Sequence, residues 1–391
     1  MRTQRAPGPL TCAPAVGILR LPAHDSRGGT RNGNGGRRFA GAGHANGSGS
    51  KRCRRAPRTR TGIVLARTKS ARAGRQRHVI DGAQRTTVMA REIVGAGSHR
   101  YEVHEEWGRL PEGIALLAAS VTVDSRDRVY CFNRSKEHPV LVFDRDGSFL
   151  ESWGAGLFAF PHVIRADRDD NLWLVDRDHG QMMLFTTGGK LLRTLGTRGA
   201  RSDTGIAAAD FRSDAWRDVK RGAGPFNLPT DIAVAPSGEM FVTDGYGNAR
   251  VHKFSPDGRL LQSWGEPGKG PGQFNLPHCV WIDRNGRLLV ADRENDRVQV
   301  FDQEGKLLEI WTTELIGPAI IYVDRDDIVY IVEHNAGMVS VLTLAGERIA
   351  RWGDPAFKSC HGIWGDSRGD LYVVRAGPWG RQRHVVKHVR L

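Results

Sequence analysis

Residues 274–295 read FNLPHCVWIDRNGRLLVADREN, and the plan of this stretch recurs along the chain. A Pro-His pair leads into an alternating apolar segment that ends in Asp. An Asn-Gly turn follows, and a second alternating segment ends in Ala-Asp-Arg. Alternation with a period of two on both sides of a polar turn is typical of a β-hairpin. The stretch therefore predicts two antiparallel strands, with His278 where the first begins and Arg293 where the second ends.

Copies of this hairpin predict a repeat fold. Six segments share its pattern, namely 121–133, 164–178, 232–246, 280–295, 321–335 and 363–376. Five segments share a second pattern of strand, glycine turn and strand closing in Trp-Gly or a variant, namely 143–154, 185–196, 254–265, 301–312 and 342–353. One interval is longer and carries an insertion at roughly 197–225. Self-similarity at about 40 residues with short strands is typical of a β-propeller that has one four-stranded blade per repeat.

The sixth copy lacks its outer part, and the other end of the chain offers the missing strand. Residues 383–391, RHVVKHVRL, supply one more strand, and residues 101–108, YEVHEEWG, end in the same Trp-Gly as the outer strands. We therefore expect an all-β fold over residues 98–391, a six-bladed β-propeller. The N-terminal strand would join the last blade and close the ring, which removes an exposed sheet edge.

The first part of the chain has a different composition. Residues 1–88 hold 19 Lys and Arg against two acids, whereas the remainder holds 38 basic and 41 acidic residues, so the +14 charge comes entirely from this segment. Few large apolar side chains are present to offset ordering entropy, so we expect a disordered Arg/Gly-rich extension over residues 1–95. We favour a misassigned start, with translation beginning near Met89. The alternatives are an Arg-rich arm that contacts RNA or membranes and an organelle transit peptide.

Composition also narrows the classes of partner and compartment. The slightly acidic propeller gives no reason for nucleic-acid binding, and no apolar run is long enough to span a membrane. The N-terminus has no clean apolar core of a secretory signal, which favours a cytoplasmic protein. Five cysteines without CxxC spacing argue against a disulfide framework or a cysteine zinc site. We also expect a monomer.

Histidines recur at one position of the repeat. The segments that lead into the innermost strands end in FAFPH, FNLPT, FNLPH, IGPA and KSCH, which places His162, His278 and His361 in blades 2, 4 and 6. Thr230 and Ala319 stand at this position in blades 3 and 5. Alternate blades of six are about 120° apart, so three imidazoles there converge on the axis. A single His after Pro is usually structural, but the threefold placement favours a zinc-type ion with an open fourth position.

Three further residues stand where second strands end. Arg134 follows that strand in blade 1, Tyr246 in blade 3 and Arg293 in blade 4. If these strand ends share one channel mouth, the tyrosine is a candidate general base and an arginine is a candidate carboxylate ligand. The alternative is that each arginine forms a surface pair with its neighbouring acid and that Gly-Tyr-Gly-Asn is a turn.

The order of several blocks resembles a known family. PTD, DGYGNAR, PGQFNLPH and ADREN follow one another within residues 226–301, and GLFAFPH surrounds His162. The segment resembles the lyase half of peptidylglycine α-amidating enzymes, and especially the bacterial peptidyl-α-hydroxyglycine α-amidating lyase-like branch of the NHL-repeat propellers. The resemblance covers about residues 98–391.

This resemblance implies a reaction and a set of site residues. It implies cleavage of the N–Cα bond of a small peptide-like or other N-acyl α-hydroxyglycine, giving an amide and glyoxylate. The implied zinc ligands are His162, His278 and His361. Tyr246 would take the hydroxyl proton, Arg134 would hold the carboxylate that becomes glyoxylate, and Arg293 would keep the Tyr246 anion accessible.

One run departs from the family pattern. The family's last zinc-binding histidine follows an apolar-Pro pair and precedes Asp, whereas here the run is Ser359-Cys360-His361-Gly362. The missing Asp would belong to a structural calcium site. The resemblance then leaves only the backbone carbonyls of Val121 and Ile164 to hold calcium.

Two other functions fit the propeller prediction. One is a non-catalytic NHL scaffold that binds protein or RNA on one face of the ring. The other is a lactonase-like metal-dependent hydrolase, although such enzymes usually use carboxylate and Asn ligands, and three histidines from alternate blades speak against it.

Overall fold

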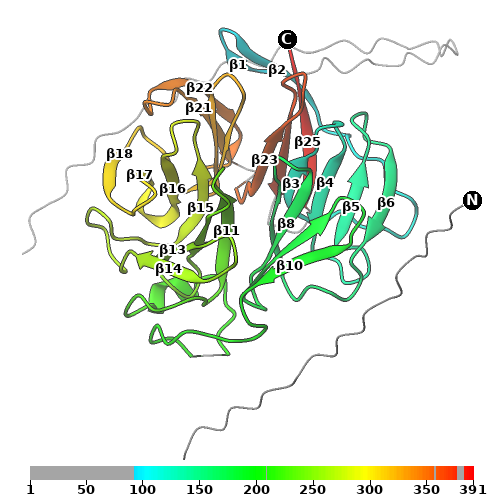
Figure 1. Cartoon of the computed structure of the whole chain (residues 1–391). Helices are drawn as coiled ribbons and strands as arrows, with labels where there is room; N and C mark the ends of the chain where they lie inside the picture. Colours follow the sequence, from blue (N-terminus) through cyan, green and yellow to red (C-terminus); the bar gives the residue numbers. More distant parts are fainter. Residues whose placement is uncertain (1–91, 208, 356–357, 377–382) are drawn as a thin grey trace, which may run out of the picture. The chain divides into compact units, whose positions relative to one another are not determined.

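The computed structural model describes residues 92–207, 209–355, 358–376 and 383–391 (Figure 1). Our expectations for the basic extension and for a start near Met89 concern residues 1–91, which lie outside the described residues.

Five blades are four-stranded antiparallel sheets whose strands follow in chain order. Blade 1 holds β3 (Ala118–Val123), β4 (Val129–Asn133), β5 (Val140–Phe143) and β6 (Phe149–Trp153). Blade 2 holds β7 (Pro161–Ala166), β8 (Asn171–Asp176), β9 (Gln181–Thr186) and β10 (Leu191–Leu195). Blade 3 holds β11 (Pro229–Val234), β12 (Met240–Asp244), β13 (Arg250–Phe254) and β14 (Leu260–Trp264). Blade 4 holds β15 (Pro277–Ile282), β16 (Leu288–Asp292), β17 (Arg297–Phe301) and β18 (Leu307–Trp311), and blade 5 holds β19 (Pro318–Val323), β20 (Val329–Glu333), β21 (Met338–Leu342) and β22 (Arg348–Gly353).

The sixth blade confirms the predicted ring closure. Its strands are β23 (Gly362–Gly365), β24 (Leu371–Ala376), β25 (Arg383–Arg390), β2 (His99–His104) and β1 (Ile93–Ala96), in that spatial order. The N-terminal strand β2 pairs antiparallel with β25, with Tyr101 opposite Arg390. The Tyr101 ring is fully buried and its hydroxyl lies 2.9 Å from that of Tyr330 in blade 5. The fold is therefore the all-β six-bladed propeller that the repeats predicted.

The folded part begins earlier than the boundary we expected at residue 95. Strand β1 starts at Ile93 and forms a hairpin with β2. The amide of Val103 donates to the carbonyl of Glu92 at 2.8 Å, and Gly97 turns the chain with a φ of +57°. A fifth strand was not foreseen because its four residues, IVGA, carry none of the repeat's marks.

The turn glycines of the repeat lie against tryptophans that end outer strands. A Cβ placed on the turn glycine of one blade would lie within about 3 Å of the tryptophan that closes another outer strand. The pairs are Gly147 with Trp107, Gly189 with Trp153, Gly305 with Trp264 and Gly346 with Trp311. These glycines also have positive φ, which a residue with a side chain rarely adopts. In these four pairs the tryptophan that ends an outer strand packs on the turn of a neighbouring blade, which gives the recurrence of both residue types a structural reason.

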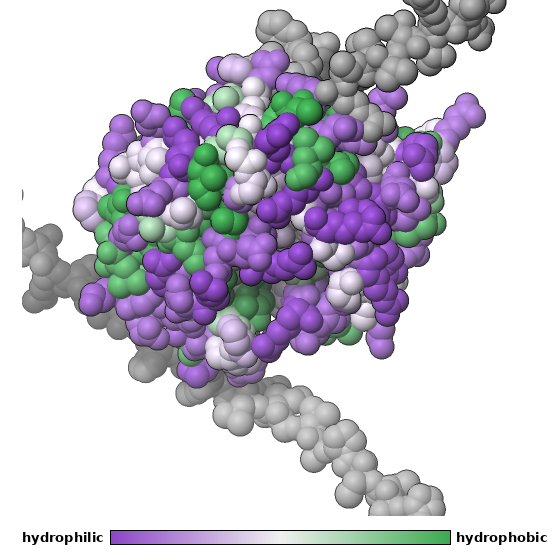
Figure 2. Space-filling model, turned by 90° about the horizontal axis from the view of Figure 1, so that it is seen from above, coloured by the Kyte–Doolittle hydropathy of each residue, from purple (hydrophilic) through white to green (hydrophobic). Residues whose placement is uncertain are grey.

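The remaining elements are short. The insertion carries a 3₁₀ helix, η1 (Ala215–Asp218), and a second, η2 (Arg293–Asn295), follows β16. Neither of these helices, the only ones among the described residues, is long enough to cross a membrane. Cys131, Cys279 and Cys360 are buried. The face shown in Figure 2 is mostly hydrophilic, with smaller hydrophobic areas between polar residues.

Candidate metal centre

A bulge at the start of the innermost strands sets the direction of the candidate ligands. In blade 4, Pro277 pairs with Asp292 and Cys279 with Ala291, so the register skips His278. The same skip leaves out Ala119, His162, Thr230 and Ala319 in blades 1, 2, 3 and 5. A bulge bends a strand and redirects the side chain of its extra residue. The position that recurs in the sequence repeat is thus the bulged residue of the inner strands of blades 1 to 5.

Buried acids hold the segments that lead into these bulges. Asp292, at the end of β16, accepts the backbone N–H of Asn275 at 2.7 Å. Asp176, Asp244 and Glu333 accept in the same way from the lead-in segments of blades 2, 3 and 5. All four acids are fully buried. The carboxylate at the end of the second strand therefore fixes where the first strand begins, and with it the bulged side chain.

Blade 6 reaches the same geometry by another route. Ser359 has a left-handed φ of +76°, close to the +66° of Leu276, which stands two residues before His278. The Ser359 amide donates to the carbonyl of His334 at 2.7 Å, and Nδ1 of His334 donates to the carbonyl of Cys360 at 3.1 Å. The run that departs from the family pattern thus presents His361 as the Leu-Pro-His run presents His278.

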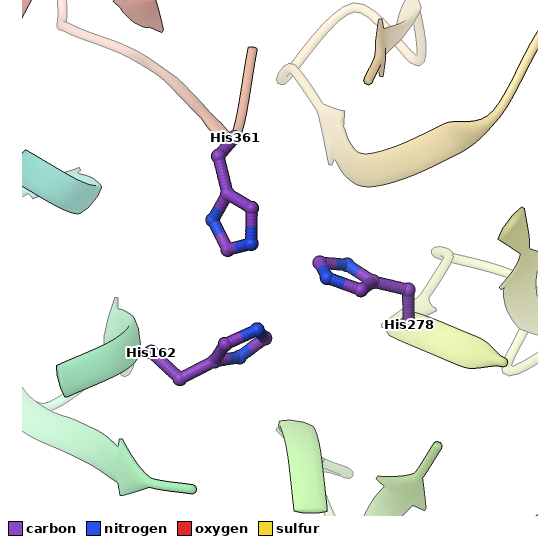
Figure 3. A group of neighbouring side chains, drawn as sticks. All are labelled: His162, His278 and His361. Carbon is purple, nitrogen blue, oxygen red and sulfur yellow. The ribbon is translucent and has the colours of Figure 1, made fainter. Parts of the chain in front are cut away.

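The three histidines face one another across the channel (Figure 3). The ring centroids of His162, His278 and His361 are 4.8–4.9 Å apart in all three pairs. One ligand nitrogen of each lies within 4.8 Å of the others, and the three residues are at most 1% exposed. Among the described residues this is the only group of three or more His, Cys, Asp or Glu side chains with metal-binding spacing.

Each imidazole is oriented by a peptide carbonyl of another blade. Nδ1 of His162 donates to Thr230 O at 2.6 Å, Nδ1 of His278 to Ala319 O at 2.8 Å, and Nδ1 of His361 to Ala119 O at 2.9 Å. All three acceptors belong to the bulged residues of the odd-numbered blades. Because a carbonyl only accepts, Nδ1 carries the proton and Nε2 keeps its lone pair, which is the arrangement of metal-binding histidines.

The surroundings of His162 and His278 keep these two rings neutral. Burial lowers the pKa of His162 well below its ordinary value, and the charge of Arg134 adds to that effect. Burial likewise lowers the pKa of His278 well below its ordinary value, with Arg293 as the next cause. Nε2 of His162 is buried with no hydrogen-bond partner among the described residues. Buried neutral imidazoles with an unsatisfied acceptor fit a zinc-type ion, although the ligands do not identify the metal.

Tyr246 and Arg293 lie beside the histidines. The Tyr246 hydroxyl is 3.2 Å from Nε2 of His278 and accepts a hydrogen bond from Nη1 of Arg293, also at 3.2 Å. Both side chains are nearly buried, at 5% and 6% exposure. The tyrosine ring packs with Leu228 and Leu276 in a small apolar cluster of its own. The structure thus brings Tyr246 of blade 3 and Arg293 of blade 4 beside the histidines of blades 2, 4 and 6.

Arg134 contacts the segment that leads to His162. Its guanidinium carbon is 4.3 Å from the centroid of the Phe160 ring, and Nε donates to the Pro161 carbonyl at 3.4 Å. Its charge contributes to the lowered pKa of His162, which places it within electrostatic reach of the centre.

Arg177 is a site residue that our sequence reasoning missed. It is 3% exposed, and its guanidinium carbon lies 3.9 Å from the Phe160 ring centroid and 5.0 Å from that of Tyr246. It also donates to the carbonyl of Phe211, in the insertion, at 3.0 Å. The sequence pattern could have predicted Arg177, because the Asp-Arg pair of LVDRD in blade 2 matches the Asp-Arg pair of LVADREN that contains Arg293.

Val121 and Ile164, the two positions implied for calcium, lie on inner strands β3 and β7 and are buried. The neighbouring position of the absent family Asp is Gly362, at the start of β23. Asp231, on the inner strand β11 of blade 3, binds the guanidinium of Arg165, the residue after Ile164.

Comparisons with known proteins agree with the fold and the repeat. A sequence model of the NHL repeat matches residues 226–254 and 274–301. The NHL repeat-containing protein 3 of Mus musculus is 32% identical over 251 residues, which cover 60% of this chain and 67% of that protein. Peptidyl-α-hydroxyglycine α-amidating lyase 2 of Drosophila melanogaster is 29% identical over 274 residues, or 65% of this chain and 61% of that protein.

Longer relatives match over one part of their length only. Peptidyl-glycine α-amidating monooxygenase A of Xenopus laevis is 36% identical over 176 residues, which are 43% of this chain but 17% of that protein. The chain thus spans about a fifth of the length of these curated relatives. Among solved structures, a gluconolactonase from Xanthomonas campestris superposes with a TM-score of 0.52 at 15% identity, covering 75% of this chain and 90% of that one. At this identity the likeness concerns the fold alone. The chain therefore belongs to the NHL-repeat propellers, as an amidating-lyase-like member of that family.

Proposed function

We propose that this protein is a metal-dependent lyase that cleaves the N–Cα bond of an N-acyl α-hydroxyglycine, giving an amide and glyoxylate. The observation that carries the proposal is the position of the Tyr246 hydroxyl, which touches both Nε2 of His278 and the guanidinium of Arg293. A proton acceptor, a cation and three neutral imidazoles therefore meet at one point. The names of the amidating-lyase relatives support the same reaction class.

In this mechanism the side chains divide the work. Tyr246, acting as the phenolate, accepts the proton of the α-hydroxyl group, and the electron pair of that O–H bond forms the carbonyl of glyoxylate as the N–Cα bond breaks. The proton then passes from Tyr246 to the departing amide nitrogen, which completes the amide product. Arg293 donates a charge-assisted hydrogen bond to the tyrosine oxygen and stabilises negative charge on it.

His162, His278 and His361 would hold the metal through Nε2. When bound, a zinc-type ion supplies Lewis acidity toward the substrate's hydroxyl oxygen. The peptide carbonyls on Nδ1 keep the three rings in place before the ion arrives, so little ordering remains to be done on binding.

Arg134 is the residue that we assign to the substrate carboxylate. A guanidinium offers two parallel donors to a carboxylate, and stacking on Phe160 fixes the plane of the fork. Arg177 stacks on the same Phe160 ring. Its guanidinium also packs on the ring of Tyr246 and keeps that side chain in place. Arg177 is paired with Asp178 at 2.7 Å, so the charge that suits an anionic substrate is assigned to Arg134.

The test is glyoxylate release from a synthetic N-acyl α-hydroxyglycine by the full chain loaded with zinc. We expect turnover that His278→Ala abolishes and that His138→Ala retains, since His138 is a partly exposed histidine bonded to Ser152 outside the centre. Zinc-loaded protein that binds one equivalent of metal but releases no glyoxylate would refute the lyase and leave the metal centre standing.

The two alternatives predict different results in the same preparation. A non-catalytic scaffold would bind no stoichiometric transition metal, and a lactonase-like hydrolase would open gluconolactone without releasing glyoxylate. The histidine-only donor set favours the lyase over the hydrolase, because the described residues offer no carboxylate cluster with metal-binding spacing.

A further inference from the structure

Arg165 buries a positive charge in the channel. It follows Ile164 on β7 and is 7% exposed. Its Nε donates to Oδ1 of Asp231 on β11 at 2.7 Å, and Nη2 bonds the second carboxylate oxygen. The same Nη2 lies 3.1 Å from Sγ of Cys279 on β15. The guanidinium thus joins the inner strands of blades 2, 3 and 4.

Aromatic rings flank this cation. The centroid of the Trp281 indole lies 5.1 Å from the Arg165 guanidinium carbon, and that of Trp364 lies 5.9 Å away. These two indoles, from blades 4 and 6, are 5.5 Å apart. Burial acts to lower the pKa of Arg165, but Asp231 outweighs it and the pKa is raised, so the side chain stays charged.

Asp231 has no acceptor capacity left for another ligand. It is fully buried, and Oδ1 accepts from Arg165 and from the Ile232 amide at 2.8 Å. Oδ2 accepts from Arg165 and from the Val280 amide at 3.2 Å. A carboxylate offers about four lone-pair sites, and these four donors use them all.

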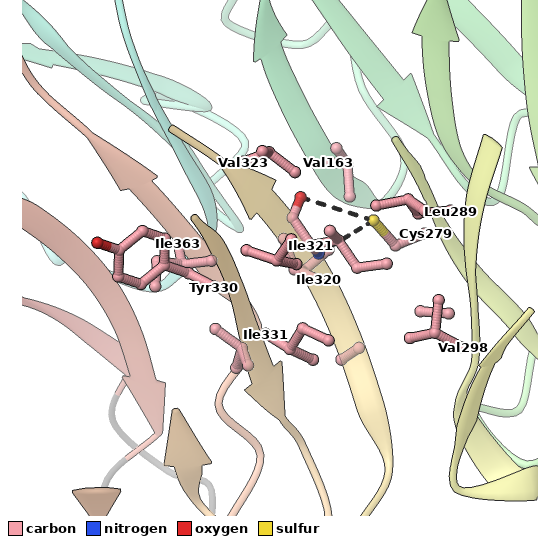
Figure 4. Close-up of a cluster of buried hydrophobic side chains, with 14 of the residues drawn as sticks. Val163, Cys279, Leu289, Val298, Ile320, Ile321, Val323, Tyr330, Ile331 and Ile363 are labelled. Atoms are coloured by element: carbon pink, nitrogen blue, oxygen red, sulfur yellow. Dashed lines mark hydrogen bonds between the residues drawn. The ribbon is translucent and has the colours of Figure 1, made fainter. Parts of the chain in front are cut away.

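The network continues into blade 5. The Ile321 amide donates to Sγ of Cys279 at 3.2 Å, a contact that Figure 4 shows among buried apolar side chains. Val280 and Ile321 stand two residues after the bulge in their blades, and at that position the backbone N–H faces the neighbouring blade. Val121 and Ile164 stand at the same position of blades 1 and 2. The level of the channel at which calcium was expected is therefore the level that the Arg165 network occupies.

The residues at this level do not fit calcium. Calcium takes six to eight oxygen ligands, usually with carboxylates among them. The carboxylate of Asp231 is saturated, and a Cβ on Gly362 would lie 2.8 Å from Cγ2 of Val374, so a side chain there needs a shift of the neighbouring strand. A fixed guanidinium beside Ile164 also repels a divalent cation.

We infer that Arg165 replaces a calcium ion as the structural cation of the channel. A covalently attached charge balances Asp231 and ties blades 2 to 5 together, so the propeller needs no calcium. This inference concerns the scaffold and does not rest on the proposed lyase activity.

The test on the wild-type full chain is direct. We purify it without added calcium, measure its calcium content by plasma mass spectrometry, and follow thermal unfolding with and without millimolar CaCl₂. We expect no stoichiometric calcium and an unchanged Tm, because an ion that binds only the native state would raise the Tm. Stoichiometric calcium, or a Tm that rises by several degrees with CaCl₂, would overturn the inference.

Variants test the charge itself. Arg165→Met leaves the Asp231 carboxylate buried and unpaired, so we expect the Tm to fall by roughly 5–10 °C. Part of that loss should return with CaCl₂, since Asp231 then regains free oxygens. Arg165→Met with Asp231→Leu should be more stable than the single variant and insensitive to calcium.

Arg168→Met, at an exposed arginine near the same strand, is the matched control and should keep the wild-type Tm. An Arg165→Met protein with unchanged Tm would contradict the inference. If that variant does not fold, the wild-type calcium measurement decides alone.

Discussion

Nδ1 of His162 donates a hydrogen bond of 2.6 Å to the backbone carbonyl of Thr230, the residue at the same position of the next blade. The acceptor is a peptide oxygen, so its presence does not depend on the side chain at position 230. The same relationship holds His278 and His361. The tautomer of all three rings is thus set by the way in which one blade packs on the next.

Removing any one of the three histidines should abolish stable metal binding. His162→Ala, His278→Ala and His361→Ala each leave two imidazoles and an unfilled, buried position. We expect affinity to fall by more than the roughly 10–100-fold that loss of a supporting residue costs. Metal content after dialysis, measured by plasma mass spectrometry, checks this, with His138→Ala as control. Retention of one equivalent by any of the three variants would contradict the assigned ligand set.

Tyr246→Phe should separate catalysis from metal binding. The substitution keeps the ring that packs on Leu228 and Leu276 and removes the oxygen that contacts His278. We expect kcat for glyoxylate release to fall about 10²–10⁴-fold, the usual contribution of a positioned base, while metal content stays at the wild-type level. Tyr130→Phe, at a buried tyrosine bonded to Asp124, serves as control and should keep full activity. Unchanged kcat in Tyr246→Phe would rule out the proposed base.

Arg134→Met should weaken substrate binding more than it slows turnover. Its guanidinium is assigned to the carboxylate, a group that carries its charge both in the substrate and in the glyoxylate formed. Loss of such uniform binding raises KM and leaves kcat closer to the wild-type value. Steady-state kinetics checks this. For a compound that lacks the carboxylate, KM and kcat should be the same with the wild type and with Arg134→Met. A fall in kcat alone, with KM unchanged, would remove Arg134 from that role.

The closure of the ring should carry a large share of its stability. Tyr101, on β2, is fully buried and bonded to Tyr330. Tyr101→Ala removes a buried aromatic side chain and should cost about 3–5 kcal/mol in urea unfolding. Tyr101→Phe loses only the hydroxyl contact and should cost about 1 kcal/mol. Equal values for the two variants would show that ring packing at the closure contributes little.

Acid should loosen the same closure. Burial lowers the pKa of His388, on β25, from 6.5 to about 4, so the folded protein keeps the ring neutral where the unfolded chain binds a proton. The stabilisation is complete above pH 6.5 and is lost as the pH falls to 4, by about 3 kcal/mol. His388→Gln should therefore lose less stability than the wild type between pH 7 and pH 4. Parallel stability curves for the two proteins over that range would contradict this.

The sequence predicted the fold wherever the same side-chain type recurs at one position of the repeat. Strand alternation, the Trp-Gly ends and the strand at Tyr101 were enough to predict six blades and their closure. The position of His162, His278 and His361 could be predicted because it recurs at one place in the repeat. The roles of Tyr246, Arg134 and Arg293 in the reaction stay predictions.

Backbone features could not be predicted in this way. The bulge that orients His162 and His278 is a skip in pairing register, and no residue type marks it. The acceptors on Nδ1 are peptide oxygens of Ala119, Thr230 and Ala319, which look unremarkable in sequence. The role of Arg165 could not be predicted either, because it depends on contacts with Asp231 and Cys279, which lie in two other blades.

The distribution of the three histidines has a consequence for how the protein is made. His361 lies in blade 6, the blade that also contains β2 from the start of the described chain. The three histidines therefore come together only when blade 6 has joined the ring. Under the proposed function, a chain interrupted before blade 6 would hold two ligands at most, so metal binding would report a finished ring.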